Sequence, residues 1–206
     1  MDEDRLRWIY SATNDTELRE RYQQWATEYD EDLAEMGWRA PWACAERAVH
    51  HAGTDARVLD AGCGTGLVGV ALHELGVRRL VGFDLSLAML NLAKARNIYE
   101  SVVEGSLTEP LPFEGKSFDA VVSVGVFTHG HVGPDGLVGL PTVIRAGGFL
   151  TMTFRDDTID ALGYGAELRR MESEGTLTLI DRTQPEPLIL EGGVGAEMRV
   201  WTWQVS

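Results

Sequence analysis

Residues 58–66 read Val58-Leu59-Asp60-Ala61-Gly62-Cys63-Gly64-Thr65-Gly66, and they determine which kind of sheet the chain can form. The stretch begins as a short apolar run and then passes three glycines at alternate positions. It continues into residues whose apolar side chains recur with helical spacing, namely Leu67, Val70, Ala71 and Leu75. A strand that enters a helix through a glycine-rich turn is typical of a parallel sheet with crossover helices.

The same alternation of short β-rich runs and helical stretches continues along the rest of the chain. The run 120–124 is apolar enough to be buried on both faces, as central strands of parallel sheets are. The last two runs are joined by a segment rich in proline and glycine, which predicts an antiparallel hairpin at one end of the sheet. We therefore predict an α/β fold with a doubly wound, mostly parallel, seven-stranded sheet. The expected strands are 57–60, 80–83, 101–103, 120–124, 149–154, 176–180 and 198–205, with a helix at 158–173.

A helical extension is predicted before the first strand. Between Asn14 and Met36 the apolar residues recur every three or four positions, which indicates one amphipathic helix. Asn14 followed by Glu17 resembles a capping box at its start. A second helix is expected to follow Pro41. We expect residues 1–52 to form a lid packed on the core, and residues 53–206 to form the ligand-binding core.

Composition limits the classes of partner. The 206 residues include 18 basic and 32 acidic side chains, a formal net charge of −14. Such a charge repels phosphate groups, and no lysine and arginine run offsets it, so we expect neither free nucleic acid nor a membrane surface as a partner. Cys44 and Cys63 lack metal-ligand spacing, so no metal site is predicted. Because the chain has no 18-residue apolar run and no signal-peptide pattern at its start, we expect a cytoplasmic protein.

The predicted ligand site lies at the carboxyl ends of the strands, where open parallel sheets bind their ligands. The glycine turn lies there, and glycine lets the backbone approach a ligand closely. Asp84 ends the second strand, 24 residues after Asp60. An acidic side chain at that place can accept hydrogen bonds from both hydroxyls of a ribose. The two features together predict a nucleoside-binding site.

The type of nucleoside is suggested by charge. Residues 64–69 formally satisfy the G-x-G-x-x-G pattern of dinucleotide sites. However, the Asp60 carboxylate beside the turn would repel a pyrophosphate, whereas it suits a ligand that carries an amino group and a sulfonium. S-adenosylmethionine is that ligand. An NAD-dependent oxidoreductase of the same fold remains the alternative prediction.

Several motifs resemble a known family. Residues 58–66 look like the first motif of class I S-adenosylmethionine-dependent methyltransferases, which have a Rossmann-like fold, and Phe83-Asp84-Leu85-Ser86 looks like their acidic motif. Phe118-Asp119-Ala120-Val121-Val122 and Gly147-Gly148-Phe149-Leu150 match as well, so the resemblance covers roughly residues 18–155. The Williams-Beuren syndrome region methyltransferase-like group is resembled in addition at Tyr22, Trp25-Ala26, Tyr29-Asp30 and Arg39-Ala40-Pro41.

The resemblance implies methyl transfer from S-adenosylmethionine, with S-adenosylhomocysteine as the product. It implies that Asp84 holds the ribose hydroxyls and that Leu85 lies against the adenine. Ser106, followed by Leu107, stands where the family often has an acidic residue that accepts a hydrogen bond from the adenine amino group. The other expected cofactor contacts are Tyr29, Asp60, Gly62, Gly64, Gly66 and Val124.

The acceptor is expected to be a small molecule that the sequence does not identify. His129 and His131 follow the fourth strand, and His129 is the candidate for contacting the substrate or acting as a base. A base is optional, because the cofactor itself supplies the reactive sulfonium. A catalytically silent protein that only binds S-adenosylmethionine is a further alternative, because a fold does not fix a function.

Overall fold

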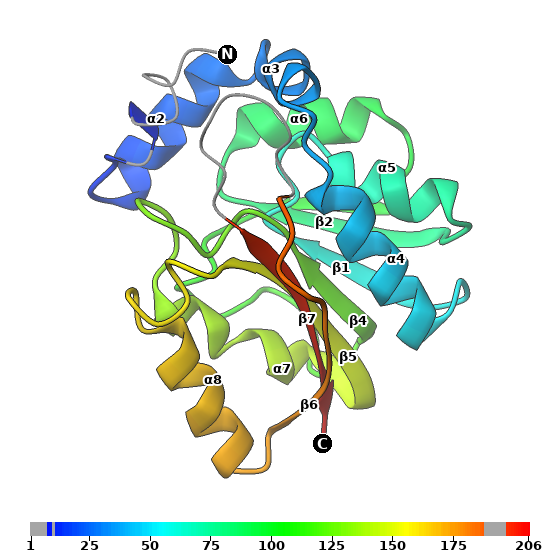
Figure 1. Cartoon of the computed structure of the whole chain (residues 1–206). Coiled ribbons are helices and arrows are strands. Elements are labelled where there is room, and N and C mark those ends of the chain that lie inside the picture. The colour runs from blue at the N-terminus through cyan, green and yellow to red at the C-terminus, as the bar shows by residue number, and fades with distance from the viewer. Residues whose placement is uncertain (1–7, 10, 188–196) are drawn as a thin grey trace.

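The computed structural model describes residues 8–9, 11–187 and 197–206, and these form one seven-stranded sheet with helices around it (Figure 1). The strand order is β3-β2-β1-β4-β5-β7-β6. The first five strands are parallel, and β7 runs antiparallel between β5 and β6. The predicted fold and its terminal antiparallel hairpin are therefore confirmed. The strands are β1 (Arg57–Ala61), β2 (Arg79–Asp84), β3 (Ser101–Glu104), β4 (Phe118–Ser123), β5 (Ile144–Arg155), β6 (Leu177–Arg182) and β7 (Met198–Val205).

Neighbouring residues of a strand point to opposite faces of a sheet, and side chains on both faces of this sheet are buried. Val58 of β1 and Leu80 of β2 pack on one face with α4 (Ala40–Ala52) and α5 (Leu67–Glu74). Leu59 and Val81 pack on the other face with η1, α7 and α8. Their bounds are η1 (Pro134–Leu137), α7 (Leu140–Val143) and α8 (Tyr164–Ser173). A further helix, α6 (Leu87–Ala95), packs on β2 and β3. Cover on both faces is what a parallel sheet requires.

The N-terminal helix predicted over 14–36 is in fact two helices, α2 (Asp15–Trp25) and α3 (Tyr29–Glu35). Across the break, the Trp25 indole N–H donates to the Asp32 carboxylate at 2.6 Å. The break brings Asp30 to the glycine turn, where its carboxylate binds Thr65. The prediction of one continuous helix is wrong because these tertiary contacts outweigh the helical propensity of the segment.

The helix predicted at 158–173 also begins later, as α8 at Tyr164. Gly163 adopts a left-handed conformation with φ 85°, which interrupts the helical path, and residues 156–162 form turns. None of the helices in the described ranges has the length and apolar character that crossing a membrane requires.

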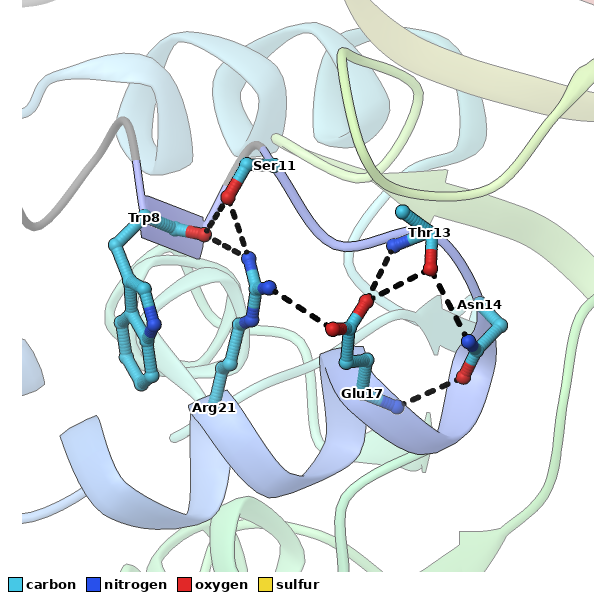
Figure 2. A network of polar contacts seen from close by, with 6 residues as sticks. All are labelled: Trp8, Ser11, Thr13, Asn14, Glu17 and Arg21. Atoms are coloured by element: carbon cyan, nitrogen blue, oxygen red, sulfur yellow. Dashed lines mark hydrogen bonds and ion pairs between the residues drawn. The ribbon is translucent and has the colours of Figure 1, made fainter.

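A polar network fixes the start of α2 (Figure 2). The Asn14 Oδ1 accepts from the Glu17 backbone N–H at 3.0 Å, as the capping prediction expects. The Glu17 carboxylate accepts from the backbone N–H and the hydroxyl of Thr13, both at 2.8 Å, so the return bond falls one residue before the cap. Arg21 pairs with Glu17 at 3.3 Å and lies over the Trp8 ring. These contacts tie the residues before α2 to the helix.

Candidate functional site

A cavity lies at the carboxyl ends of the parallel strands, between the sheet and the N-terminal helices. Its floor is formed by residues that follow β1, end β2 and follow β3 and β4, including Gly62, Asp84, Ser106 and Val124. Its roof is formed by α2 and α3, which contribute Leu18, Arg19, Tyr22 and Tyr29. The loop after β4 closes one side with Val126, His131 and Val132. The cavity thus occupies the position where sheets of this type bind ligands.

Most residues predicted to contact a cofactor meet in this cavity. Asp60 and Gly66 are the exceptions, because neither belongs to its lining. Those that line it are Tyr29, Gly62, Gly64, Asp84, Leu85, Ser106, Leu107 and Val124.

The glycine turn is built on internal hydrogen bonds. The backbone N–H groups of Gly62 and Cys63 donate to the Phe83 carbonyl at 2.7 and 3.0 Å. A Cβ on Gly62 would stand 2.2 Å from the Val126 side chain, so glycine is required for the loop after β4 to pack there. A Cβ on Gly64 would meet nothing within 4 Å, although Gly64 has a φ of 54° and lines the cavity. Gly64 therefore leaves open space for a ligand to approach the backbone.

Asp84 joins β2 to the glycine turn. Its Oδ2 accepts from the Gly64 N–H and its Oδ1 accepts from the Ser86 N–H, both at 2.8 Å. Burial raises the pKa of the Asp84 carboxyl above its usual value, and these backbone donors oppose the shift. Each carboxylate oxygen can accept a second hydrogen bond, so Asp84 can still bind a pair of ligand hydroxyls.

Asp60 lies below the turn and away from the cavity lining. Its side chain is fully buried, and its Oδ2 accepts from the Tyr99 hydroxyl at 2.7 Å. Its Oδ1 has no hydrogen-bond partner among the described residues. Burial raises the pKa of Asp60 to about 7, and the Tyr99 bond opposes that shift. Gly66 packs against the same Tyr99, because a Cβ there would come within 3.1 Å of its ring.

Ser106, the residue predicted at the edge of the adenine, already makes hydrogen bonds with Thr108. The Ser106 hydroxyl lies 2.8 Å from the Thr108 hydroxyl and accepts from the Thr108 N–H at 3.3 Å. Leu85 and Leu107 give this part of the cavity apolar walls. Val124 lies directly after β4 and lines the cavity beside Gly125.

The loop after β4 carries two histidines, and the structure separates their positions. His129, the residue selected from the sequence, is exposed and does not line the cavity. His131 lines it and lies 2.6 Å from the Tyr22 hydroxyl. Spacing along the chain could not reveal this pair, because 109 residues separate its members. In the described part of the chain, no group of three or more His, Cys, Asp or Glu side chains could hold a metal ion.

Comparison with known proteins identifies the class of protein that the chain resembles. Residues 58–148 match the family described as "Methyltransferase domain". A TehB-like SAM-dependent methyltransferase from Corynebacterium glutamicum superposes with a TM-score of 0.66 and 23% identity, over 91% of this chain and 99% of that one. Residues 58–148 are therefore similar to a methyltransferase domain, and the chain has the fold of S-adenosylmethionine-dependent methyltransferases.

Within that class, the chain is 36% identical over 162 residues to Methyltransferase-like protein 27 of Homo sapiens, which agrees with the Williams-Beuren group resemblance. That alignment covers 75% of this chain and 65% of the relative. The 18S rRNA (guanine-N(7))-methyltransferase of Bos taurus is 43% identical over 67 residues, which cover 32% of this chain and 24% of that protein. The chain thus spans 65% and 24% of the lengths of these two relatives.

Proposed function

We propose that this protein transfers the methyl group of S-adenosylmethionine to a small-molecule acceptor. The observation that carries the proposal is one cavity in which the glycine turn, the acidic end of β2 and the two N-terminal helices meet. The sulfonium of the bound cofactor supplies the reactive methyl group. The protein's tasks are then to align the acceptor and to exclude water.

The residues of the cavity fit the proposed cofactor. Asp84 would accept from the ribose hydroxyls, with Leu85 and Leu107 against the adenine and Ser106 at its edge. The open space at Gly64 would admit the methionine part. Gly62, Tyr29 and Val124 line the same region. Asp60 and Gly66 would act without touching the cofactor, by shaping the turn around Tyr99.

The nicotinamide alternative is disfavoured by the turn itself. A pyrophosphate needs backbone N–H donors. Four such groups in this turn already donate within the protein: Gly62 and Cys63 to Phe83, Gly64 to Asp84, and Gly66 to the Cys63 carbonyl. The charge of Asp60 does not disfavour a pyrophosphate, because this carboxyl is buried and its raised pKa weakens any repulsion at neutral pH.

A small acceptor is supported by charge and enclosure. The net charge of −14 opposes binding of a phosphate backbone. The cavity is also roofed by α2 and α3, so an acceptor has to fit beneath or beside them. A relative that is named for methylating 18S rRNA makes RNA the competing acceptor class. We further propose that residues 1–52 act as the lid of a core that spans residues 53–206.

Titration calorimetry tests the cofactor assignment. We expect micromolar binding of S-adenosylhomocysteine and no measurable binding of NAD. The reverse preference would overturn the methyltransferase assignment. Turnover of radiolabelled S-adenosylmethionine in a cell extract, before and after removal of macromolecules by filtration, then distinguishes three possibilities. Label incorporated from the filtrate supports a small acceptor, incorporation that requires RNA contradicts it, and no incorporation from either fraction indicates a catalytically silent protein.

A further inference from the structure

One polar pair in the cavity is not used by the proposed cofactor contacts. The Tyr22 hydroxyl and the His131 Nε2 lie 2.6 Å apart and join α2 to the loop after β4. Their rings meet edge to face, with centroids 5.6 Å apart. Both residues line the same cavity as Gly62 and Asp84. The pair therefore connects roof and side wall at the site itself.

The direction of the hydrogen bond follows from the other ring nitrogen. The His131 Nδ1 lies 2.8 Å from the carbonyl oxygen of His129, and a carbonyl oxygen can only accept. Nδ1 therefore carries the ring proton. Burial lowers the pKa of His131 to about 4, so the ring is neutral at pH 7 and Nε2 is an acceptor.

Tyr22 therefore donates its hydroxyl proton to Nε2. A phenolic oxygen can also accept hydrogen bonds, and one that is already donating is a better acceptor, because chains of hydrogen bonds polarise one another. Tyr22 thus offers a bound molecule an oxygen that accepts.

The surroundings of the pair favour an uncharged ligand. Leu18, Val126 and Val132 line the cavity near it with apolar side chains. Among the described lining residues, the carboxylate is Asp84, which is bound to the glycine turn. The guanidinium is that of Arg19, which is exposed and donates through Nε to the Leu85 carbonyl at 3.1 Å. A cationic amine would find no second carboxylate in this lining.

We propose that Tyr22 and His131 form the acceptor end of the cavity, and that the acceptor is an uncharged hydroxyl compound whose O–H donates to the Tyr22 oxygen. This inference rests on the proposed function, which it makes more specific. Tyr22 is then the catalytic residue that touches the acceptor, and His131 acts through Tyr22, by positioning its hydroxyl and receiving its proton.

The same two residues take up the proton that the acceptor loses during methyl transfer. The acceptor oxygen forms its bond to the methyl carbon as the S–CH₃ bond of S-adenosylmethionine breaks. The acceptor proton passes to the Tyr22 oxygen, and the Tyr22 proton passes to the His131 Nε2. An oxygen that is gaining a methyl group becomes strongly acidic, so even a weak base accepts its proton. The products are a methyl ether, neutral S-adenosylhomocysteine and a protonated His131, which then releases its proton to water.

The test uses the full chain saturated with S-adenosylhomocysteine and the probes phenol and anisole, which differ in the hydroxyl proton. Binding is measured by NMR titration, with the ¹⁵N resonance of the His131 Nε2 as a second readout. We expect phenol to bind at least tenfold more tightly than anisole and to shift that resonance, whereas anisole leaves it unchanged. Tyr22→Phe keeps the aromatic ring and removes the hydroxyl, so the affinity ratio should fall to about one. His129→Gln changes the exposed histidine of the same loop and should preserve the ratio.

Benzoate and benzylammonium, titrated in the same way, are the anionic and cationic probes. The inference would be overturned by no phenol binding, by equal affinities for phenol and anisole in the parent, or by tighter binding of either charged probe. An unchanged ratio in Tyr22→Phe would do the same. If that variant fails to fold, the Nε2 resonance of the parent decides, because a purely structural pair would not respond to phenol and ignore anisole. Failure of the parent to bind S-adenosylhomocysteine would instead contradict the proposed function.

Discussion

The hydroxyl of Thr65 donates to the carboxylate of Asp30 at 2.5 Å, and this bond joins the glycine turn to α3. Arg96 completes the contact, because its guanidinium pairs with the other Asp30 oxygen and its Nε donates to the Thr65 carbonyl at 2.5 Å. The roof of the cavity is thus fastened to its floor beside Tyr29.

The first prediction concerns the motion of the roof. We expect α2 and α3 to open in the empty protein and to close over S-adenosylhomocysteine, because they are held by a small apolar cluster and by polar contacts of Arg19, Tyr22 and Asp30. Hydrogen exchange of residues 15–35 should slow when the ligand is added. Equal protection in both states would mean that these helices are a fixed structural element.

Asp30→Asn tests the closure directly. The Asp30 side chain is 43% exposed, so its ion pair with Arg96 is screened by water. We expect S-adenosylhomocysteine to bind about two- to fivefold more weakly, roughly 0.5–1 kcal/mol, and residues 29–35 to exchange faster. Glu31→Gln, one position along the same helix and exposed, is the matched control. A similar loss in both variants would indicate a general effect of charge.

Asp84→Ala should weaken binding of S-adenosylhomocysteine by about 1.5–3 kcal/mol, the range for hydrogen bonds to a charged group. The motivation is the position of Asp84 in the cavity lining, with acceptor capacity remaining on both oxygens. Glu104→Ala removes an exposed carboxylate that pairs in register with Asp84 on the neighbouring strand, and it should bind normally. Unchanged affinity in Asp84→Ala would show that the ribose assignment is wrong.

Gly69→Ala should lower the free energy of unfolding by about 1–3 kcal/mol, the usual cost of overpacking. A Cβ at Gly69 would stand 2.1 Å from the Tyr99 hydroxyl, which is held in place by Asp60. The ring carbon Cζ of Tyr99 would also stand 2.4 Å from that Cβ. Tyr99→Phe removes the hydroxyl and its bond to Asp60, so the ring can shift, and the double variant should lose less stability than the sum of the two single variants. Denaturant unfolding measures all three. Additive losses would mean that the cost of Gly69→Ala does not arise from the Tyr99 hydroxyl.

The sequence allowed the sheet and one end of the site to be predicted because both depend on local patterns. Alternating apolar runs located all seven strands to within a few residues, with the greatest difference at the start of β5. The glycine turn and Asp84 were both predicted at the carboxyl ends of the strands, and there the Gly64 N–H donates to the Asp84 carboxylate.

The features that the sequence did not predict depend on contacts between distant segments. The break between α2 and α3 follows from Asp30 meeting Thr65, and the Tyr22–His131 pair joins a helix to a loop far along the chain. The position of Asp60 outside the cavity, in contrast, could have been predicted from the strand pattern. Residues two apart in a strand share a face, so Asp60 belongs with Val58, which packs beneath α5. That pattern pointed away from the cavity.

The buried carboxyl of Asp60 leads to the last prediction, which concerns pH. Its pKa in the folded protein is about 7, whereas its usual value is 3.8. The folded protein therefore holds the Asp60 proton more tightly than the unfolded chain does. The stability that this proton provides is fully present below about pH 4 and is lost as the pH rises to about 7, after which the loss is complete. The free energy of unfolding should decline across this window through Asp60.

Asp60→Asn replaces the carboxyl with an uncharged group of the same shape, whose oxygen can still accept from Tyr99. At pH 8 the variant should be more stable than the parent, by about 2–4 kcal/mol, and the difference should shrink towards zero near pH 4. Denaturant unfolding at several pH values between 4 and 8 measures this, with Asp55→Asn, an exposed carboxylate before β1, as the control. A variant that is less stable than the parent at pH 8 would show that the ionised Asp60 is stabilised by the fold, and that its second oxygen has a partner in solution.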